Sequence, residues 1–320
     1  WLGWLTDKDY VSHTPVALDG SNSGLQHFSA MLRDPVGGAA VNLLPCEKPQ
    51  DVYMQVAKRA QEIVDSQPTI TITRKDGEGE EYSETHPNPW VGGKVTRKIA
   101  KRPTMTYCYS ATRYGMVDMI HQTLREIDGD GEPHLGGFDN YQAASYLSYA
   151  IWDAISQTVV AASGAMAWLR DVAKATTKAG IPVWWTNPVG LPVLQMYCEE
   201  SSKQLAVYVG GKRLQVKMNV DSSTVLRSST QANAIAPNFV HSFDAAHLMS
   251  VANSCRNAGI KYIAVIHDSF GTHAANAGVL STLLRETFIN QYSPDVLSRF
   301  RDQVVSQLPP DAANDIGPPP

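Results

Sequence analysis

The sequence predicts an α+β fold, and two patterns indicate it. Large apolar residues recur at the 3.6-residue period of a helix, most clearly over residues 147–169. Shorter stretches alternate in polarity around glycine-containing turns, as in residues 69–83, and this is typical of antiparallel hairpins. Helices and antiparallel strands are therefore expected to share the chain.

The strands are expected at four places. A short strand ends at Asp19-Gly20, because an apolar run leads into a turn dipeptide there. Residues 69–83 form a hairpin whose charged tip, at Asp76-Gly77, is exposed to solvent. The apolar run within residues 261–273 leads to His267-Asp268, which is expected at or beside the tip of a hairpin. The remaining extended segment covers residues 181–216, with turns at Asn187-Pro188 and Gly210-Gly211.

The helices follow the same reading of periodicity. Residues 147–169 carry Asp153 and Gln157 within the apolar pattern, so they predict a buried amphipathic helix rather than a membrane span. Pro103 predicts a kink or a helix start within the basic segment that surrounds it. The tail from residue 311 is expected to be flexible. The other helices are expected over residues 22–33, 49–66, 237–258 and 279–308.

Composition limits the class of protein. The chain has 320 residues, 43% of them hydrophobic and 18% charged, which is typical of a globular protein of two domains or one large one. Its 27 Lys and Arg against 31 Asp and Glu exclude binding to nucleic acid through bulk charge, but they leave room for a local basic groove. The four cysteines contain no Cys-x-x-Cys, which argues against a disulfide scaffold and a four-thiolate zinc site.

Asp19 is the first candidate for chemistry. A carboxylate at the end of a strand can project from the sheet and bind a cation, and the Gly20 carbonyl would add a second hard oxygen. This combination suits magnesium. The alternative is an ordinary Asp-Gly-Ser turn, which is common in loops.

A basic segment is the second candidate. Residues 85–117 contain six cationic residues and no acid. Residues spaced four apart form one slowly winding stripe on a helix, and this stripe would present two cations, a thioether and a phenol to a nucleoside triphosphate. The alternative is a solvated cationic face. The stripe consists of Arg97, Lys101, Met105 and Tyr109.

The pair His267-Asp268 is the third candidate. Asp268 would lie at the tip of a buried hairpin, and Asp19 would lie at the end of another strand. Two carboxylates on rigid strands are the minimum for a two-metal site, whose ions lie about 4 Å apart. A turn-forming role for Asp268 is the alternative.

Three segments together resemble the single-subunit, bacteriophage-type DNA-dependent RNA polymerases. ALDGSNSGLQHFSAMLRDP (17–35) resembles motif A of that family, RKIAKRPTMTYCYSATRYG (97–115) motif B, and IHDSFGTH (266–273) motif C. The order is the family's order, and the resemblance covers nearly the whole chain. It implies a right-hand polymerase fold, with an antiparallel palm sheet and a mainly helical fingers insertion. Further segments that resemble the family are 41–45, 50–53, 235–248 and 295–303.

The resemblance implies the roles of individual residues. Asp19 and Asp268, with the Gly20 carbonyl, would bind two Mg²⁺ ions, and Lys101 would act on the departing pyrophosphate as a catalytic residue. Arg97 would bind the triphosphate of the NTP. The other residues that the resemblance assigns to substrate binding are Tyr109 and His247 at the ribose, His267 beside the RNA 3′ end, and Tyr53 in the nucleotide pocket. For His247, the sequence leaves a histidine on a helix surface as the alternative.

Residues 203–215 resemble one arm of the hairpin with which the phage enzymes read their promoters. Arg213 and Gln215 match base-reading positions, where Arg suits guanine and Gln suits adenine. Lys203 and Leu205 match two other reader positions but differ in type from the best-known members. Ser110 also departs from the family, which usually has Gly after the tyrosine, and the chain ends in GPPP rather than an aromatic tail.

The resemblance also predicts how the chain is divided. Residues 1–35 would be the first part of the palm and 36–247 the fingers, with motif B at 94–115 and the promoter hairpin at 181–216. Residues 248–320 would be the second part of the palm and the tail. The chain starts at Trp1, just before motif A, so we expect a fragment that lacks the promoter domain and the thumb.

The expected reaction is template-directed synthesis of RNA from NTPs. The expected partners are template and promoter DNA, nascent RNA and the missing N-terminal part, with no membrane, in the cytoplasm of a host cell. Three alternatives remain open: a DNA polymerase of the related DNA polymerase I (family A) type, a non-catalytic nucleic-acid-binding remnant, and a two-metal phosphohydrolase. Met105 and His247 favour RNA over DNA synthesis, and hydrolases usually gather more carboxylates and histidines than the pair found here.

Overall fold

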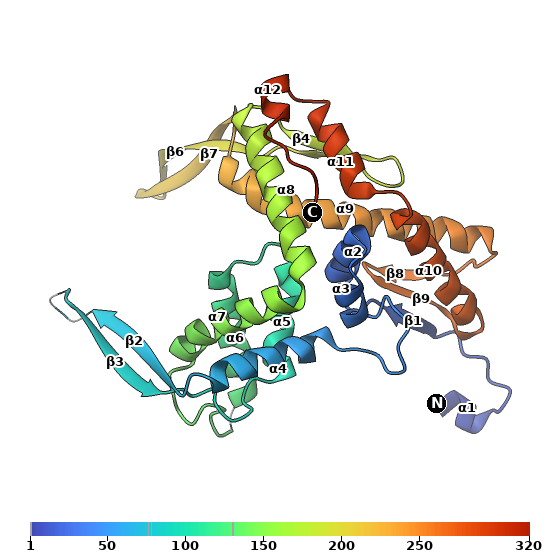
Figure 1. The fold of residues 1–320 in the computed structure, drawn as a ribbon, viewed down its shortest axis with the longest axis horizontal. Helices are drawn as coiled ribbons and strands as arrows, with labels where there is room; N and C mark the ends of the chain where they lie inside the picture. Colours follow the sequence, from blue (N-terminus) through green and yellow to red (C-terminus); the bar gives the residue numbers. More distant parts are fainter. Residues whose placement is uncertain (1, 76, 78, 130) are drawn as a thin grey trace.

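A three-stranded antiparallel sheet joins the two ends of the sequence (Figure 1). The computed structural model describes residues 2–75, 77, 79–129 and 131–320. The strand order is β1-β9-β8, so the strand nearest the N-terminus pairs with the second strand of the C-terminal hairpin. The strands are β1 (Pro15–Asp19), β8 (Ala264–Ile266) and β9 (Ser269–His273). The predictions of a strand ending at Asp19 and of a hairpin with His267-Asp268 at its tip are confirmed.

Helices pack around this sheet and behind it. Helix α2 (Ser23–Leu32) begins directly after β1, where the Asn22 side chain accepts a hydrogen bond from the backbone N–H of Leu25. It packs against α8 (Val160–Lys178) and against the long helix α9 (Ser228–Asn257), which in turn packs against α10 (Ala277–Tyr292). Helix α9 starts nine residues earlier than the expected 237–258 and contains Pro237.

A second group of helices lies away from the sheet, in the lower part of Figure 1. It consists of α4 (Val52–Asp65), α5 (Arg97–Tyr107), α6 (Arg113–Asp128) and α7 (Asn140–Thr158). The single helix predicted over 147–169 is wrong, because the chain leaves helical geometry at Val159 (φ −126°, ψ 56°) between α7 and α8. No Gly or Pro lies at this break, so the apolar residues keep a helical period on both sides of Val159 and the sequence gives no sign that the helix ends there.

Among the described residues, three two-stranded hairpins complete the strands, and all three begin in the predicted extended segments 69–83 and 181–216, although β3 continues to Pro87 and β7 to Leu226. Their bounds are β2 (Thr69–Lys75) with β3 (Glu81–Pro87), β4 (Val183–Thr186) with β5 (Pro192–Gln195), and β6 (Cys198–Val209) with β7 (Lys212–Leu226). The predicted tip residue Asp76 lies outside the described residues. The long β6–β7 hairpin extends from the body of the molecule in Figure 1.

The C-terminal part differs from its prediction in two respects. The helix expected over 279–308 is two helices, α10 and α11 (Val296–Val305), because Pro294 interrupts it and the Asp295 side chain caps α11. The tail is held in place: Ile316 is buried, and the Gly317 carbonyl accepts hydrogen bonds from two side chains. The remaining elements are α1 (Leu2–Thr6), α3 (Pro35–Ala40), the 3₁₀ helix η1 (Ala274–Asn276) and α12 (Pro310–Ala313). None of the described helices has the length and apolar character that a bilayer crossing requires.

Candidate functional site

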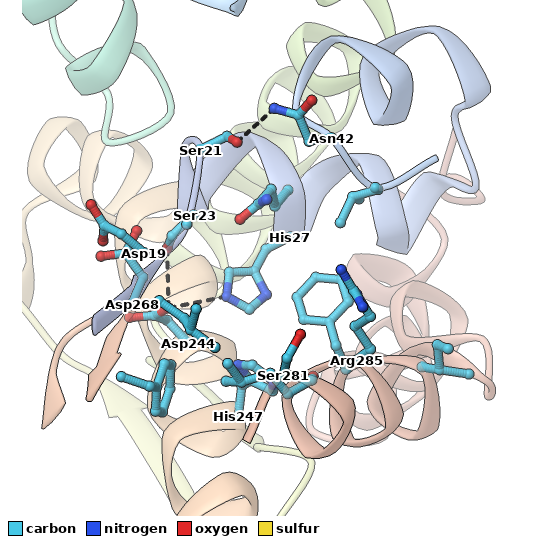
Figure 2. A pocket seen from close by; sticks show the side chains of 18 residues that line it. Asp19, Ser21, Ser23, His27, Asn42, Asp244, His247, Asp268, Ser281 and Arg285 are labelled. Carbon is cyan, nitrogen blue, oxygen red and sulfur yellow. Dashed lines mark hydrogen bonds and ion pairs between the residues drawn. The ribbon is translucent and has the colours of Figure 1, made fainter. Parts of the chain in front are cut away.

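Asp19 and Asp268 lie side by side at one edge of the sheet (Figure 2). Asp19 is the last residue of β1 and pairs in register with Ser269, the first residue of β9. Asp268 belongs to the two-residue turn between β8 and β9, and the backbone N–H of Gly20 donates to its carbonyl oxygen at 3.3 Å. The strand register therefore fixes the two carboxylates as neighbours although 249 positions separate them in the sequence.

The electrostatics of the pair reflect this closeness. Burial raises the pKa of the Asp268 carboxyl, and the negative charges of Asp19 and Asp244 raise it further against an opposing backbone hydrogen bond. The Asp268 carboxylate lies close to the backbone of Gly20, since a Cβ added at Gly20 would lie 2.9 Å from Asp268 Oδ2 and 3.0 Å from Gln26 Oε1. Two neighbouring carboxylates whose charges repel each other favour a bound cation.

The carboxylates face a cavity of about 440 Å³ between the sheet, α2, α9 and α10 (Figure 2). Its apolar lining residues are Leu18, Leu43, Phe270, Leu284, Phe288 and Ile289. Its polar and charged lining residues are Asp19, Ser21, Ser23, Gln26, His27, Asn42, Asp244, His247, Asp268, Ser281 and Arg285. Of the site residues predicted from sequence, Asp19, Gly20, Asp268 and His247 are brought together in this lining.

Buried His27 and half-buried Asp244 form a pair in the same cavity lining, and neither was predicted. His27 Nε2 lies 3.2 Å from Asp244 Oδ1, and the Ser23 hydroxyl donates to the same oxygen at 3.0 Å. Burial alone would raise the pKa of Asp244, but the hydrogen bonds from His27 and Ser23 outweigh it and place this pKa below its usual range. One signal was present in the sequence, because Asp244 precedes His247 by three positions on a predicted helix and so shares a face with it.

His247 is buried, with 9% of its surface exposed, so the alternative of a histidine on a helix surface is wrong. Its Nε2 lies 3.1 Å from the Leu284 carbonyl oxygen, which can only accept, and 3.1 Å from the Thr287 hydroxyl. Nε2 therefore carries a proton. Burial lowers the pKa of His247, which keeps the ring neutral near pH 7 and leaves Nδ1 as a hydrogen-bond acceptor.

The basic stripe lies on α5 and in the turn that follows it. Arg97, Lys101 and Met105 are exposed along one side of the helix, and Pro103 is accommodated inside it. Tyr109 lies beyond the last helical residue and is half-buried, and burial raises its pKa to about 12. The stripe is thus present, but its phenol belongs to a turn.

Arg97 and Tyr53, both predicted to bind the nucleotide, are in contact. The Arg97 guanidinium lies 5.3 Å from the centre of the Tyr53 ring and forms an ion pair with Asp51. The Tyr53 hydroxyl donates to the Ser21 carbonyl at 3.0 Å, and the charge of Asp268 is one cause of its raised pKa, after burial. This contact connects α5 to the loop that follows Asp19.

Two turn residues in the predicted site adopt left-handed backbone geometry. His267 has φ 53° at the first position of the β8–β9 turn, where a tight hairpin needs positive φ, and its side chain is exposed. Ser110 has φ 60° directly after Tyr109, at the position where the resembling family usually has Gly. That conformation is the one in which glycine is favoured.

The predicted DNA-reading residues lie on the β6–β7 hairpin, away from the cavity. Residues paired across two strands have their side chains on the same face of the hairpin. Arg213 pairs with Tyr208 and Gln215 pairs with Ala206, so Arg213 and Gln215 lie together on one face, which is polar. Lys203 and Leu205 lie on the other face, because their partners are Met218 and Val216. The two-residue turn at Gly210-Gly211 sets this register, and it separates the four reader positions into two pairs.

Comparison with known proteins gives a consistent result. Residues 4–316 match the family described as DNA-dependent RNA polymerase. The chain is 40% identical to the DNA-directed RNA polymerase of Enterobacteria phage T3 and 38% identical to the T7 RNA polymerase of Escherichia phage T7, in each case over 93% of this chain and 37% of the relative. It is 34% identical to the DNA-directed RNA polymerase 2A of Nicotiana tabacum over 93% of this chain and 85% of that protein.

The chain spans little more than a third of the length of the phage relatives. The match extends from before β1 to beyond α12, so it includes both strand ends that carry the carboxylates and the whole helical insertion between them. The chain belongs to the DNA-dependent RNA polymerase family.

Proposed function

We propose that this chain carries the catalytic centre of a template-directed RNA polymerase, which transfers a nucleotidyl group from an NTP to an RNA 3′ end. The observation that carries the proposal is the juxtaposition of Asp19 and Asp268 in the lining of a cavity that contains both polar and apolar side chains. Membership of the polymerase family supports the same chemistry. The proposed partners are template and promoter DNA, nascent RNA, NTPs and a preceding part of the polymerase.

The residues at this edge fit divalent magnesium. Magnesium prefers one or two carboxylates together with phosphates and water, rather than a cage built by protein alone. Asp19, Asp268 and the Gly20 carbonyl would hold two ions. When bound, these ions would lower the pKa of the RNA 3′-hydroxyl and stabilise the charge of the departing pyrophosphate.

The exposed cations of α5 would bind and orient the triphosphate. The planar guanidinium of Arg97 suits two phosphate oxygens at once, although it must then share its charge with Asp51. Lys101 lies one turn further along the same side of α5 and would place its ammonium on the leaving phosphates or donate a proton to them. His267, beside Asp268, would contact the RNA 3′ end.

The sugar would lie between Tyr109 and His247, with Tyr53 bordering the pocket. Neutral His247 offers Nδ1 as an acceptor, and a ribose 2′-hydroxyl is a donor that deoxyribose lacks. A site built for that hydroxyl loses a hydrogen bond when the deoxynucleotide binds. This preference distinguishes the proposal from the DNA polymerase alternative.

The proposed architecture is the right-hand polymerase fold. Residues 1–35 and 248–320 would form the palm, because β1 belongs to the first segment and β8 and β9 to the second. Residues 36–247, mainly helical apart from three hairpins, would form the fingers. On the β6–β7 hairpin, Arg213 and Gln215 would contact promoter bases from the polar face, where their cross-strand neighbours are Tyr208 and Ala206.

Extension of an RNA primer annealed to a DNA template tests this function without requiring a promoter. In the complete polymerase that contains this chain, the wild type should extend the primer with Mg²⁺ and NTPs, whereas Asp19→Asn and Asp268→Asn should each abolish extension. Asp171→Asn, at an exposed position on α8, is the matched control and should retain the wild-type rate. Extension by either active-site variant at the control's rate would contradict the metal assignment, and a complete wild-type polymerase that extends nothing would contradict the proposed function.

A further inference from the structure

Gly24 on α2 lies against two residues that follow α5. A Cβ added at Gly24 would lie 2.9 Å from the Cβ of Cys108 and 3.2 Å from the Tyr109 hydroxyl oxygen, with the ring carbon Cζ at 3.3 Å. A separation below 3.0 Å is too short for real side chains, and one of 3.0–3.4 Å requires the neighbour to move by a few tenths of an ångström. The phenol of Tyr109 and the residue before it therefore occupy the space that a side chain at position 24 would need.

The backbone of α2 gives no other reason for a glycine at this position. Gly24 is the second residue of a regular helix and has no positive φ, so any L-residue could adopt its conformation. Glycine also makes a helix less stable than alanine does. The close approach of Cys108 and Tyr109 is therefore what requires a residue without a side chain.

Two further contacts hold Tyr109 in this place. Its backbone N–H donates to the Thr106 carbonyl at 3.0 Å, which fixes the main chain at the end of α5. The ring of His241, on α9, makes a T-shaped contact with the Tyr109 ring, with centroids 4.7 Å apart. Together with the contact at Gly24, these neighbours on three helices determine where the phenol lies.

Helix α2 also belongs to the carboxylate site. Gly24 follows Asp19 by only five positions, and Ser23, the residue before it, lines the cavity (Figure 2). The Asn22 side chain caps the helix, so the turn between β1 and α2 is held in place. Tyr109 comes from the helical insertion, but its phenol rests on the same segment that carries one of the two carboxylates.

We infer that Gly24 positions the Tyr109 hydroxyl for selection of the sugar, because only a residue without a side chain leaves the phenol its place at the start of α2. From that place the hydroxyl can hydrogen-bond the 2′-hydroxyl of a ribonucleotide, a group that a deoxyribonucleotide lacks. Gly24 acts through Tyr109 and is therefore a positioning residue, and His241 supports the same ring. This inference rests on the proposed function and on the assignment of Tyr109 to the ribose.

The ratio of kcat/KM for ATP to that for dATP, measured in single-nucleotide primer extension by the complete polymerase, tests the inference. Gly24→Ala should lower this ratio about 3- to 10-fold, because displacement of the phenol weakens one hydrogen bond to the ribonucleotide. The kcat/KM for dATP should stay at its wild-type value. Gly164→Ala is the matched control and should leave both values unchanged. It also replaces a helical glycine, but among the described residues nothing outside its own stretch of α8 lies within 4 Å of the added Cβ.

A double-mutant cycle separates positioning from general damage. Tyr109→Phe should itself lower the ATP to dATP ratio, and Gly24→Ala should then lower it no further, since the hydroxyl through which Gly24 acts is gone. If Gly24→Ala lowers kcat/KM equally for both nucleotides, or leaves the ratio at its wild-type value, the inference is overturned. In that case the wild-type polymerase would still extend primers, and the proposed function would stand.

His241 provides a second test that leaves the contact between α2 and Cys108 unchanged. His241 is exposed on α9, so its replacement should not prevent folding. His241→Ala should lower the ATP to dATP ratio, whereas His241→Phe keeps an aromatic ring against Tyr109 and should retain most of it. An unchanged ratio in His241→Ala, or equal losses in the two variants, would contradict the positioning of Tyr109 by its neighbours.

A crystal structure of Gly24→Ala gives a readout that does not depend on catalysis. The Tyr109 hydroxyl should lie a few tenths of an ångström further from α2 than in the wild type, because its contact with the added methyl group is otherwise too short. A phenol that keeps its wild-type position would show that Gly24 does not determine where the hydroxyl lies, and would overturn the inference.

Discussion

Replacing Ser110 with glycine should stabilise the protein, and the structure allows the size of the effect to be worked out. Ser110 has φ 60°, and its N–H donates to the Tyr107 carbonyl at 3.1 Å, so the turn after α5 requires this geometry. For an L-residue the left-handed conformation costs about 1–2 kcal/mol, which glycine avoids. The Ser110 hydroxyl is also buried, with no hydrogen-bond partner among the described residues.

Two opposing effects determine the net change. Glycine makes the unfolded chain more flexible, and this lowers the unfolding free energy by about 0.5–1 kcal/mol. The backbone then contributes a net increase in unfolding free energy of about 0.5–1 kcal/mol. Removal of the unpaired hydroxyl adds to that gain. Ser110→Ala removes the hydroxyl as well but keeps the left-handed cost, so it serves as the matched control. Ser110→Gly should therefore exceed Ser110→Ala by about 0.5–1 kcal/mol.

Equilibrium unfolding in urea measures the difference. The midpoint should rise in the order Ser110→Ala and then Ser110→Gly, at an unchanged m-value, because the surface exposed on unfolding is the same. If Ser110→Ala is as stable as Ser110→Gly, the turn does not hold this residue in the left-handed region. The explanation of the departure at this position would then be wrong.

Two further predictions concern the carboxylates. Without Mg²⁺, Asp268→Asn should raise the melting temperature, because it removes a buried charge that Asp19 and Asp244 repel, and added Mg²⁺ should stabilise the wild type but not this variant. A lower melting temperature for the variant in metal-free buffer would contradict this. The stabilisation from ionised Asp244 is fully present above its unfolded pKa of about 3.8 and is lost as the pH falls through its lower folded pKa. Unfolding free energy should thus fall more steeply below pH 4 in the wild type than in Asp244→Asn, and parallel curves would refute it.

The sequence predicted the carboxylate pair because its signals are local. An apolar run followed by Asp-Gly marks the end of β1, and an apolar run ending in His-Asp marks the tip of β8–β9. Each strand end could be read without its partner. Only the pairing of β1 with β9 had to come from the three-dimensional structure, and the register then placed Asp19 beside Asp268.

The His27–Asp244 pair in the cavity lining could not be predicted from local sequence patterns. His27 and Asp244 are 217 positions apart, and either could have been an ordinary polar residue on its helix. Their contact depends on how α2 packs against α9, which no local pattern specifies. Two other differences also depend on tertiary packing rather than on local sequence. The helix ends at Val159 although its helical period continues, and Ile316 is buried although it lies in a segment with the composition of a flexible tail.

On the β6–β7 hairpin, the sequence predicted the positions of the reader residues but not which of them share a face. Sequence resemblance places Lys203, Leu205, Arg213 and Gln215 at equivalent positions along the two strands. Which of them share a face depends on the register, and one residue more or less in the turn would exchange the faces of one strand. The turn Gly210-Gly211 decides this, so the pairing of reader residues is a property of the turn rather than of the strands.

The sheet that joins the two ends of the sequence also sets the time at which the site can form during synthesis. β1 is made before its partner β9, which ends at His273, so 249 further residues must be added after Asp19 before Asp268 exists. At 5–20 residues per second this delay is roughly 12–50 s. During that interval β1 is an unpaired strand, and the helices between the two motifs can pack before it is covered. Chains that stop before Asp268 therefore lack the carboxylate pair altogether, and the site can form only after the helices between the two motifs have been made.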